Sequence, residues 1–191
     1  MSLKRSDHPA LILVDIQKGF ADIAYWGGQR NNPGAELRAS ELLQTWRDHH
    51  LPIFHIQHCS TIPTSLLHET NPGNQFNELV APLEGETIIK KQVNSAFIGT
   101  DLQAQLDKAN ISTLVIVGLT TDHCVSTSTR MAGNLGYKTF LVADATATFN
   151  KKGPDGTNYP AELIHETALA SLHEEFATVV TTHFIKQKIS D

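Results

Sequence analysis

The chain has 191 residues, 40% of them hydrophobic and 18% charged, and its 15 basic and 20 acidic side chains give a net charge of −5. This composition is typical of a folded domain and excludes disorder, so we expect residues 1–191 to form a single domain. The acidic balance, with no long basic run, argues against a nucleic-acid partner.

Continuous apolar segments recur along the chain and are typical of strands that are covered on both faces of a sheet. They predict strands at 9–16, 51–58, 87–91, 113–119, 139–145 and 177–184. Apolar residues at helical spacing lie between them. These patterns predict helices at 35–50, 101–109, 123–135 and 161–176.

This alternation of strands and helices predicts an α/β fold with three layers, α/β/α, around a doubly wound, six-stranded, mainly parallel sheet of Rossmann-like type. In such sheets a ligand binds beyond the carboxyl ends of the strands. Side chains at those ends that can act as an acid, a base or a nucleophile are therefore the candidates for a functional site.

Three such side chains follow predicted strands. Asp15 follows the first strand, Lys90 and Lys91 end the third, and Cys124 begins the helix after the fourth. A thiol at a helix N-terminus and near an ammonium is favoured as a thiolate, and a carboxylate can take and return its proton. Taken singly, each residue has an ordinary structural explanation, as a turn, surface or packing residue, but their convergence on one edge favours chemistry.

The turn before Cys124 adds a further element. Gly118 permits a sharp bend, and unpaired backbone N–H groups at the start of the following helix are suited to hold a developing oxyanion. A strand, a sharp turn and then a nucleophile at a helix start is the arrangement of a nucleophile elbow, here with sulfur in place of oxygen.

Three motifs resemble those of the isochorismatase-like cysteine hydrolases, a family that includes nicotinamidases, N-carbamoylsarcosine amidases and isochorismatases. The motifs are ALILVDIQ at 10–17, KQVNSAF at 91–97 and VGLTTDHCVST at 117–127, and the pattern continues through 136–137 and 142–145. The resemblance covers nearly the whole chain, and the three motifs occur in order at the predicted strand ends.

The resemblance implies a catalytic triad of Asp15, Lys91 and Cys124. It selects Lys91 over Lys90 because the lysine of the family lies four residues before the serine of its Ser-Ala-Phe motif. It also implies a cis peptide bond between Leu119 and Thr120. The oxyanion hole that it implies consists of the backbone N–H groups of Thr120 and Cys124.

The chain departs from the family at the metal site of nicotinamidases, an Asp-x-His pair with a further His after the second strand. Residues 51–100 contain no Asp, and His55 and His58, three apart on a strand, are expected to face opposite sides of the sheet. We therefore expect no metal and no other cofactor. The absence of the metal-site residues of nicotinamidases also argues against nicotinamide as the substrate.

The expected pocket lies among the loops 20–33, 59–80 and 148–160, whose shape the sequence does not reveal. Phe20, Trp26 and Phe97 either contact the substrate or pack in a core or a subunit contact. His58 either contacts the substrate or is solvated in its loop. Asn94 either binds the substrate or caps a turn. The candidates for substrate binding are Phe20, Trp26, His58, Asn94, Phe97 and Leu119.

Together these features predict a metal-independent cysteine hydrolase that cleaves a C–N bond of a small amide or ureide through a thioester. The alternatives are a vinyl-ether hydrolase of isochorismatase type and a catalytically idle scaffold of the same fold. No glycine-rich nucleotide-binding motif occurs.

The partner of the predicted enzyme is a small-molecule substrate. No apolar run approaches the ~20 residues of a membrane span, and the first eight residues lack the apolar core of a secretory signal. We therefore expect no membrane partner and a cytoplasmic location with two free thiols, Cys59 and Cys124. The resemblance implies a homo-oligomer, either a dimer or a tetramer.

Overall fold

A computed structural model describes residues 2–190. Six strands, all paired in parallel, form one sheet in the order β3-β2-β1-β4-β5-β8. The strands are β1 (Ala10–Val14), β2 (Ile53–His58), β3 (Thr87–Lys91), β4 (Thr113–Leu119), β5 (Lys138–Ala147) and β8 (Thr178–Val180). The order reverses between β1 and β4, which makes the space beyond their carboxyl ends the expected place for a ligand.

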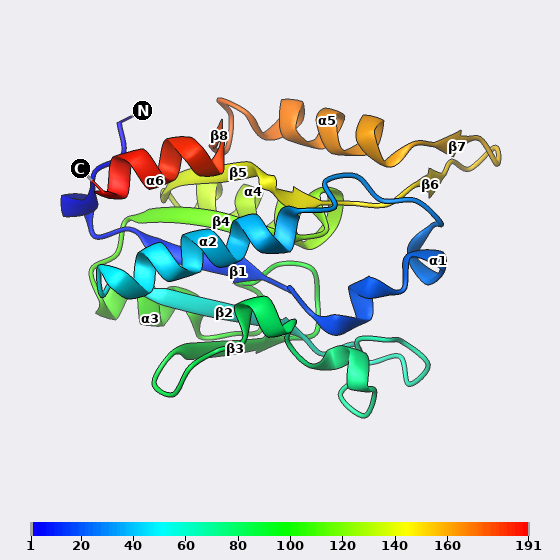
Figure 1. The fold of residues 1–191 in the computed structure, drawn as a ribbon, viewed down its shortest axis with the longest axis horizontal. Helices are drawn as coiled ribbons and strands as arrows, with labels where there is room; N and C mark the ends of the chain where they lie inside the picture. Colours follow the sequence, from blue (N-terminus) through cyan, green and yellow to red (C-terminus); the bar gives the residue numbers. More distant parts are fainter. Residues whose placement is uncertain (1, 191) are drawn as a thin grey trace.

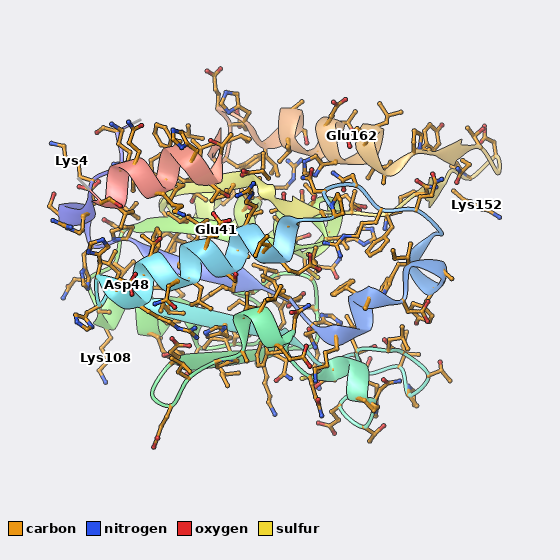
Figure 2. The ribbon with its side chains drawn as sticks, in the orientation of Figure 1. Lys4, Glu41, Asp48, Lys108, Lys152 and Glu162 are labelled. Carbon is orange, nitrogen blue, oxygen red and sulfur yellow. The ribbon has the colours of Figure 1, made fainter. Side chains whose placement is uncertain are left out.

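Helices cover both faces of the sheet, so the predicted three-layer, doubly wound fold is confirmed (Figure 1). One face carries α2 (Ala35–Asp48) and α6 (Thr182–Ser190). The other face carries α3 (Leu102–Lys108), α4 (Ser126–Asn134) and α5 (Ala161–Leu172). Charged side chains such as Lys108, Lys152 and Glu162 project outward from this layered body (Figure 2).

The alternation of side chains along β1 builds a separate core on each face of the sheet. Leu11 and Leu13 pack toward α2, where Trp46 is fully buried. Ile12 and Val14 pack on the opposite side, toward α3 and α4. Each fully buried aliphatic side chain contributes about 1.5–3 kcal/mol, so the continuous apolar pattern of β1 is explained by burial on both faces.

Gly118 allows β4 to lie against the end of β1. It pairs with Val14, has a φ of 127°, and a Cβ at this position would meet the Val14 carbonyl oxygen at 2.0 Å. No residue with a side chain fits so close to a neighbouring backbone. The turn that follows β4 is thereby brought beside Asp15.

The last predicted strand, 177–184, is wrong in its second half. Strand β8 ends at Val180, and the helix α6 begins at Thr182. The Asp144 carboxylate accepts hydrogen bonds from the Thr182 N–H and hydroxyl, at 2.7 and 3.0 Å, and so fixes the start of the helix. Ile185 and Ile189, four residues apart, then bury the same face of α6.

Loops that were not predicted to hold regular structure extend beyond the carboxyl edge of the sheet. They contain the short helix α1 (Ile23–Trp26) and the hairpin of β6 (Lys151–Lys152) and β7 (Asn158–Tyr159), which lie together at one end of the molecule (Figure 1). None of the helices within residues 2–190 has the length and apolar character needed to cross a bilayer.

Candidate active site

Asp15, Lys91 and Cys124 meet at the carboxyl edge of the sheet. The Lys91 ammonium lies 2.6 Å from Asp15 Oδ2 and 3.3 Å from Cys124 Sγ, and it donates a hydrogen bond to each. The side chains of Asp15 and Lys91 are both 0% exposed. A buried charge pair of this kind is costly to desolvate, so its presence beside a thiol favours a chemical role over a stabilising one.

Asp15 is held in an unusual backbone conformation. It directly follows β1 and has a φ of 51°, in the left-handed region that side chains other than Gly rarely adopt. Its N–H continues the sheet by donating to the Ile56 carbonyl at 3.0 Å. Strained residues of this kind concentrate at functional sites, where the surrounding structure enforces them.

Cys124 lies in a π-helical turn, Thr121–Val125, between β4 and α4. The peptide bond between Leu119 and Thr120 is cis, and the Thr120 carbonyl accepts from the N–H groups of His123 and Val125 at 3.1 and 3.2 Å. The turn is also held from outside, because Asp122 accepts a hydrogen bond from the hydroxyl of Thr148, the residue that follows β5.

The direction in which its surroundings shift the pKa of the thiol differs from the sequence-based expectation. Burial raises the pKa of Cys124, and the Asp15 carboxylate raises it further, against an opposing effect of the Lys91 ammonium. The expectation of a favoured thiolate rested on the helix N-terminus and the ammonium, and it did not include the effect of burial. Burial has the largest effect and the Asp15 carboxylate adds to it, so the pKa of Cys124 shifts in the direction that favours the thiol over the thiolate.

His58 is a third contact of the Lys91 ammonium, with its Nδ1 3.1 Å from Nζ. Burial and the nearby Lys91 charge lower the pKa of His58, and Asp15 opposes this shift. Donor atoms of Asp15, His58 and Cys124 all lie within 4.8 Å of one another, which is a spacing that a metal ion accepts. All three residues, however, contact the Lys91 ammonium, so the donor set is organised around a cation that the chain itself supplies.

A cavity of about 290 Å³ opens above Cys124. Phe20 and Trp26 form an aromatic wall, with ring centroids 4.6 Å apart, and Phe149 stacks behind them. Asn94 lies on the other side, with its Oδ1 3.7 Å from the thiol sulfur. Of the predicted binding residues, the cavity is lined by Phe20, Trp26, His58 and Asn94, together with Thr120 of the predicted oxyanion hole.

The structure places Phe97 and Leu119 outside this cavity. Phe97 stacks on Tyr137, with centroids 5.9 Å apart, against the core beneath α3 and α4. Leu119 is 1% exposed and packs behind the aromatic wall. Both residues occur within the family-like motifs, but adjacent residues of a strand or turn face different sides, and these two side chains face the core.

Sequence reasoning missed several lining residues. They belong to the three loops expected to shape the pocket or to the cysteine turn, but loop sequence alone does not indicate which side chains turn inward. Lys151, for example, reaches the cavity from β6 and lies 3.5 Å from Asp122. The missed residues are Tyr25, Ile62, Ser65, Leu67, His123 and Lys151.

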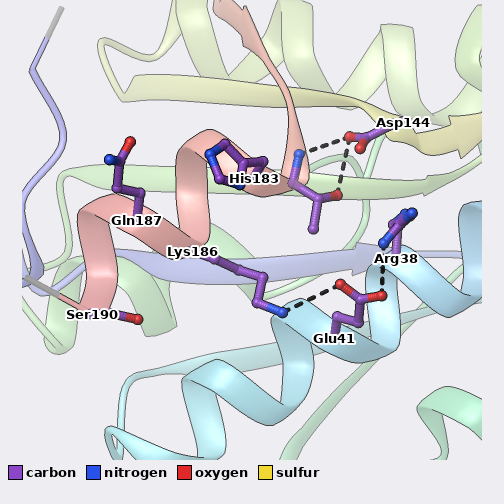
Figure 3. Close-up of a pocket in the computed structure, with 8 residues that line it drawn as sticks. Arg38, Glu41, Asp144, His183, Lys186, Gln187 and Ser190 are labelled. Carbon is purple, nitrogen blue, oxygen red and sulfur yellow. Dashed lines mark hydrogen bonds and ion pairs between the residues drawn. The ribbon is translucent and has the colours of Figure 1, made fainter.

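A larger groove of about 720 Å³ lies between α2 and α6, away from the thiol (Figure 3). Its charges are already paired, since Glu41 accepts from Arg38 at 2.8 Å and from Lys186 at 3.3 Å. Asp144 is occupied by the start of α6. The smaller cavity, which is lined by the Cys124 thiol that the buried ion pair contacts, is therefore the candidate active site.

The fold and the site together define a class: a doubly wound α/β protein with a cysteine, an aspartate and a lysine gathered at the point where the strand order reverses. The family model of the isochorismatase domain matches residues 9–184. This chain therefore belongs to the isochorismatase family, a family of hydrolases.

Individual relatives agree with this assignment. The isochorismatase family protein YrdC of Bacillus subtilis (strain 168) is 50% identical over 173 residues, 91% of either chain. The maleamate amidohydrolase of Pseudomonas putida is 31% identical over 121 residues, 63% of this chain and 52% of the relative. A crystal structure of an isochorismatase-family protein from Chromobacterium violaceum has a TM-score of 0.94 and 40% identity, covering 100% of this chain and 98% of that one.

Proposed function

We propose that this hydrolase is a metal-independent cysteine amidohydrolase, which cleaves a C–N bond of a small amide or ureide through a thioester. The observation that carries the proposal is the contact of one buried ammonium, Lys91 Nζ, with both Asp15 Oδ2 and Cys124 Sγ, the thiol that lines the cavity. The similarity to a maleamate amidohydrolase supports the choice of a C–N bond.

In the first half of the reaction, Asp15 takes the proton of the Cys124 thiol as sulfur attacks the carbonyl carbon. The other oxygen of Asp15, Oδ1, is buried and has no partner within hydrogen-bond distance among residues 2–190, so it has the capacity to accept this proton. A thiol with a raised pKa needs such a base, which acts only as the C–S bond forms. The backbone N–H groups of Thr120 and Cys124 hold the oxyanion.

In the second half, the C–N bond breaks and Asp15 returns the proton to the leaving amine. A water molecule then gives a proton to Asp15 and adds to the thioester carbon. The C–S bond breaks, the acid is released, and the proton on Asp15 returns to the sulfur. The Lys91 ammonium stays charged throughout and balances the carboxylate and the developing thiolate.

A resident metal is not needed in this scheme. The donor atoms of Asp15, His58 and Cys124 converge on the Lys91 ammonium, which already supplies a positive charge at their centre. A metal ion at that point would lie against a like charge. Turnover is therefore expected to survive dialysis against a strong chelator.

The deciding experiment combines a panel of small amides and ureides, scored for released ammonia or amine, with mass spectrometry of the acid-quenched enzyme. The expected result is turnover of at least one substrate and an adduct on Cys124 that has the mass of the acyl group. Cys124→Ala should abolish both while the melting temperature stays near that of the wild type. Cys59→Ala is the matched control, since Cys59 is a buried thiol that does not line this cavity.

Other outcomes would favour the alternatives. Turnover of a vinyl ether that persists in Cys124→Ala would indicate isochorismatase-type chemistry, in which the thiol is not the nucleophile. A folded wild-type protein that turns over no amide, ureide or vinyl ether would support the idle scaffold.

A further inference from the structure

His58 and Lys91 are neighbours because of the way in which β2 and β3 pair. They are the last residues of β2 and β3, and the parallel register pairs them directly. Paired residues on adjacent strands project to the same face of a sheet. The imidazole and the ammonium therefore leave the sheet side by side, at its carboxyl edge.

The hydrogen bonds of the ammonium define the state of the imidazole. A lysine ammonium has three N–H donors and no acceptor. Lys91 Nζ has three partners within hydrogen-bond distance, at 2.6 Å (Asp15 Oδ2), 3.1 Å (His58 Nδ1) and 3.3 Å (Cys124 Sγ). Nδ1 must accept, so the ring is neutral and carries its proton on Nε2.

The backbone of His58 is held unusually firmly for a residue at a strand end. The Gln17 side chain accepts from the His58 N–H at 2.9 Å and donates to its carbonyl at 3.1 Å. Asn74 Nδ2 donates to the same carbonyl at 2.9 Å. Gln17 is itself 1% exposed. This arrangement fixes the point from which the imidazole projects toward Lys91.

We propose that His58 is a positioning residue whose Nδ1 accepts the third hydrogen bond of the Lys91 ammonium and so keeps that ammonium aimed between Asp15 and Cys124. This inference rests on the proposed function, because it assigns the ammonium a place in the reaction. Without the imidazole acceptor, one N–H of a fully buried ammonium has no partner. The ammonium then turns away from the sulfur to find another acceptor, and the developing thiolate loses its counter-charge.

Two substitutions separate the hydrogen bond from the shape of the ring. In His58→Asn, the amide oxygen can stand where Nδ1 stood, so the acceptor is kept. In His58→Phe, a ring of similar size is kept and the acceptor is lost. His183→Asn, on α6 and in the separate groove of Figure 3, is the matched control.

The expected result is a kcat lowered roughly ten- to hundredfold in His58→Phe, with a KM that changes by less than about threefold. His58→Asn should recover kcat to within about threefold of the wild type, and His183→Asn should match the wild type. Equal losses in His58→Asn and His58→Phe, or a loss confined to KM, would overturn the proposal.

A second measurement does not depend on any substrate. Nitrogen-15 NMR of the histidine-labelled protein at neutral pH should show His58 as a neutral ring protonated on Nε2, and Lys91→Met should change its signals. A ring protonated on Nδ1, or a doubly protonated ring, would overturn the proposal even if amides are turned over. If no amide is turned over but the expected tautomer is found, the proposed function fails while the hydrogen bond of the ammonium stands.

Discussion

Two histidines three residues apart on β2 show how position decides the role of one residue type. His55 is fully buried and faces α2, with its Nε2 2.8 Å from a carboxylate oxygen of Glu86, which Arg47 also binds at 2.7 and 2.9 Å. His58 faces the cavity and contacts an ammonium. One imidazole therefore donates its hydrogen bond, and the other accepts.

The comparison of His55 with His58 shows that a buried charge network is not by itself an active site. The network of Arg47, Glu86 and His55 ties the segment before β3 to α2. Those three residues neither line the cavity nor contact its thiol, whereas Lys91, paired with Asp15, donates a hydrogen bond to Cys124, which lines the cavity. The presence of a nucleophile and of space for a ligand distinguishes the two.

Breaking the Asp15–Lys91 pair should have the largest effect. Lys91→Met removes the counter-charge of a fully buried carboxylate, so we expect a loss of about 3–5 kcal/mol in the free energy of unfolding and loss of turnover. Denaturant titration measures the first effect. The double variant Asp15→Asn with Lys91→Met should regain much of the stability but no activity. A Lys91→Met protein as stable as the wild type would contradict the buried pair.

Replacing only the carboxylate should change the thiol in the opposite sense from Lys91→Met. Since the Asp15 charge raises the pKa of Cys124, Asp15→Asn should lower that pKa. Alkylation of Cys124, followed by mass spectrometry as a function of pH, should then reach a given rate at a lower pH than in the wild type, although turnover is lost. Lys91→Met should shift the profile to higher pH. Shifts of the same sign in both variants would contradict the arrangement.

In the second network, Glu86→Gln should lower stability without affecting catalysis. The Arg47 guanidinium and His55 help to hold the pKa of Glu86 at about 2, so the carboxylate is charged at all ordinary pH values. Its loss leaves buried donors without a charged acceptor and should cost about 1–3 kcal/mol of unfolding free energy. The kcat of the folded variant should equal that of the wild type, and a lower kcat would show that the two networks are coupled.

The smallest effect concerns acid pH. Burial lowers the pKa of His55. Between the folded and the unfolded pKa values, the imidazole is therefore protonated in the unfolded chain and neutral in the folded protein. Stability from this group is complete above pH 6.5 and is lost as pH falls toward the folded pKa, by at most about 1.4 kcal/mol per pH unit. His58, His123 and His165 are shifted in the same direction. His55→Phe should therefore reduce the acid slope of the unfolding free energy without removing it.

The sequence predicted the layered sheet and the edge where chemistry would gather, because continuous apolar strands and their polar ends are local patterns. It did not reveal the second histidine network, since Glu86 reaches His55 and Arg47 only through folding. It did place the Asp15 carboxylate beside Cys124, but the thiolate that it favoured is opposed by burial, which raises the pKa of Cys124 and is decided only by the folded structure.

By itself, the amino-acid order determined which residues could react and on which strand ends they stand, since strand periodicity and glycine placement are read along the chain. The tertiary structure alone decided which side chains touch. The register of β2 and β3 pairs His58 with Lys91, and the close approach at Gly118 brings Cys124 beside Asp15. Such contacts join residues that are distant in sequence. The distances between these residues, their burial and their pKa values therefore arise only in the folded structure.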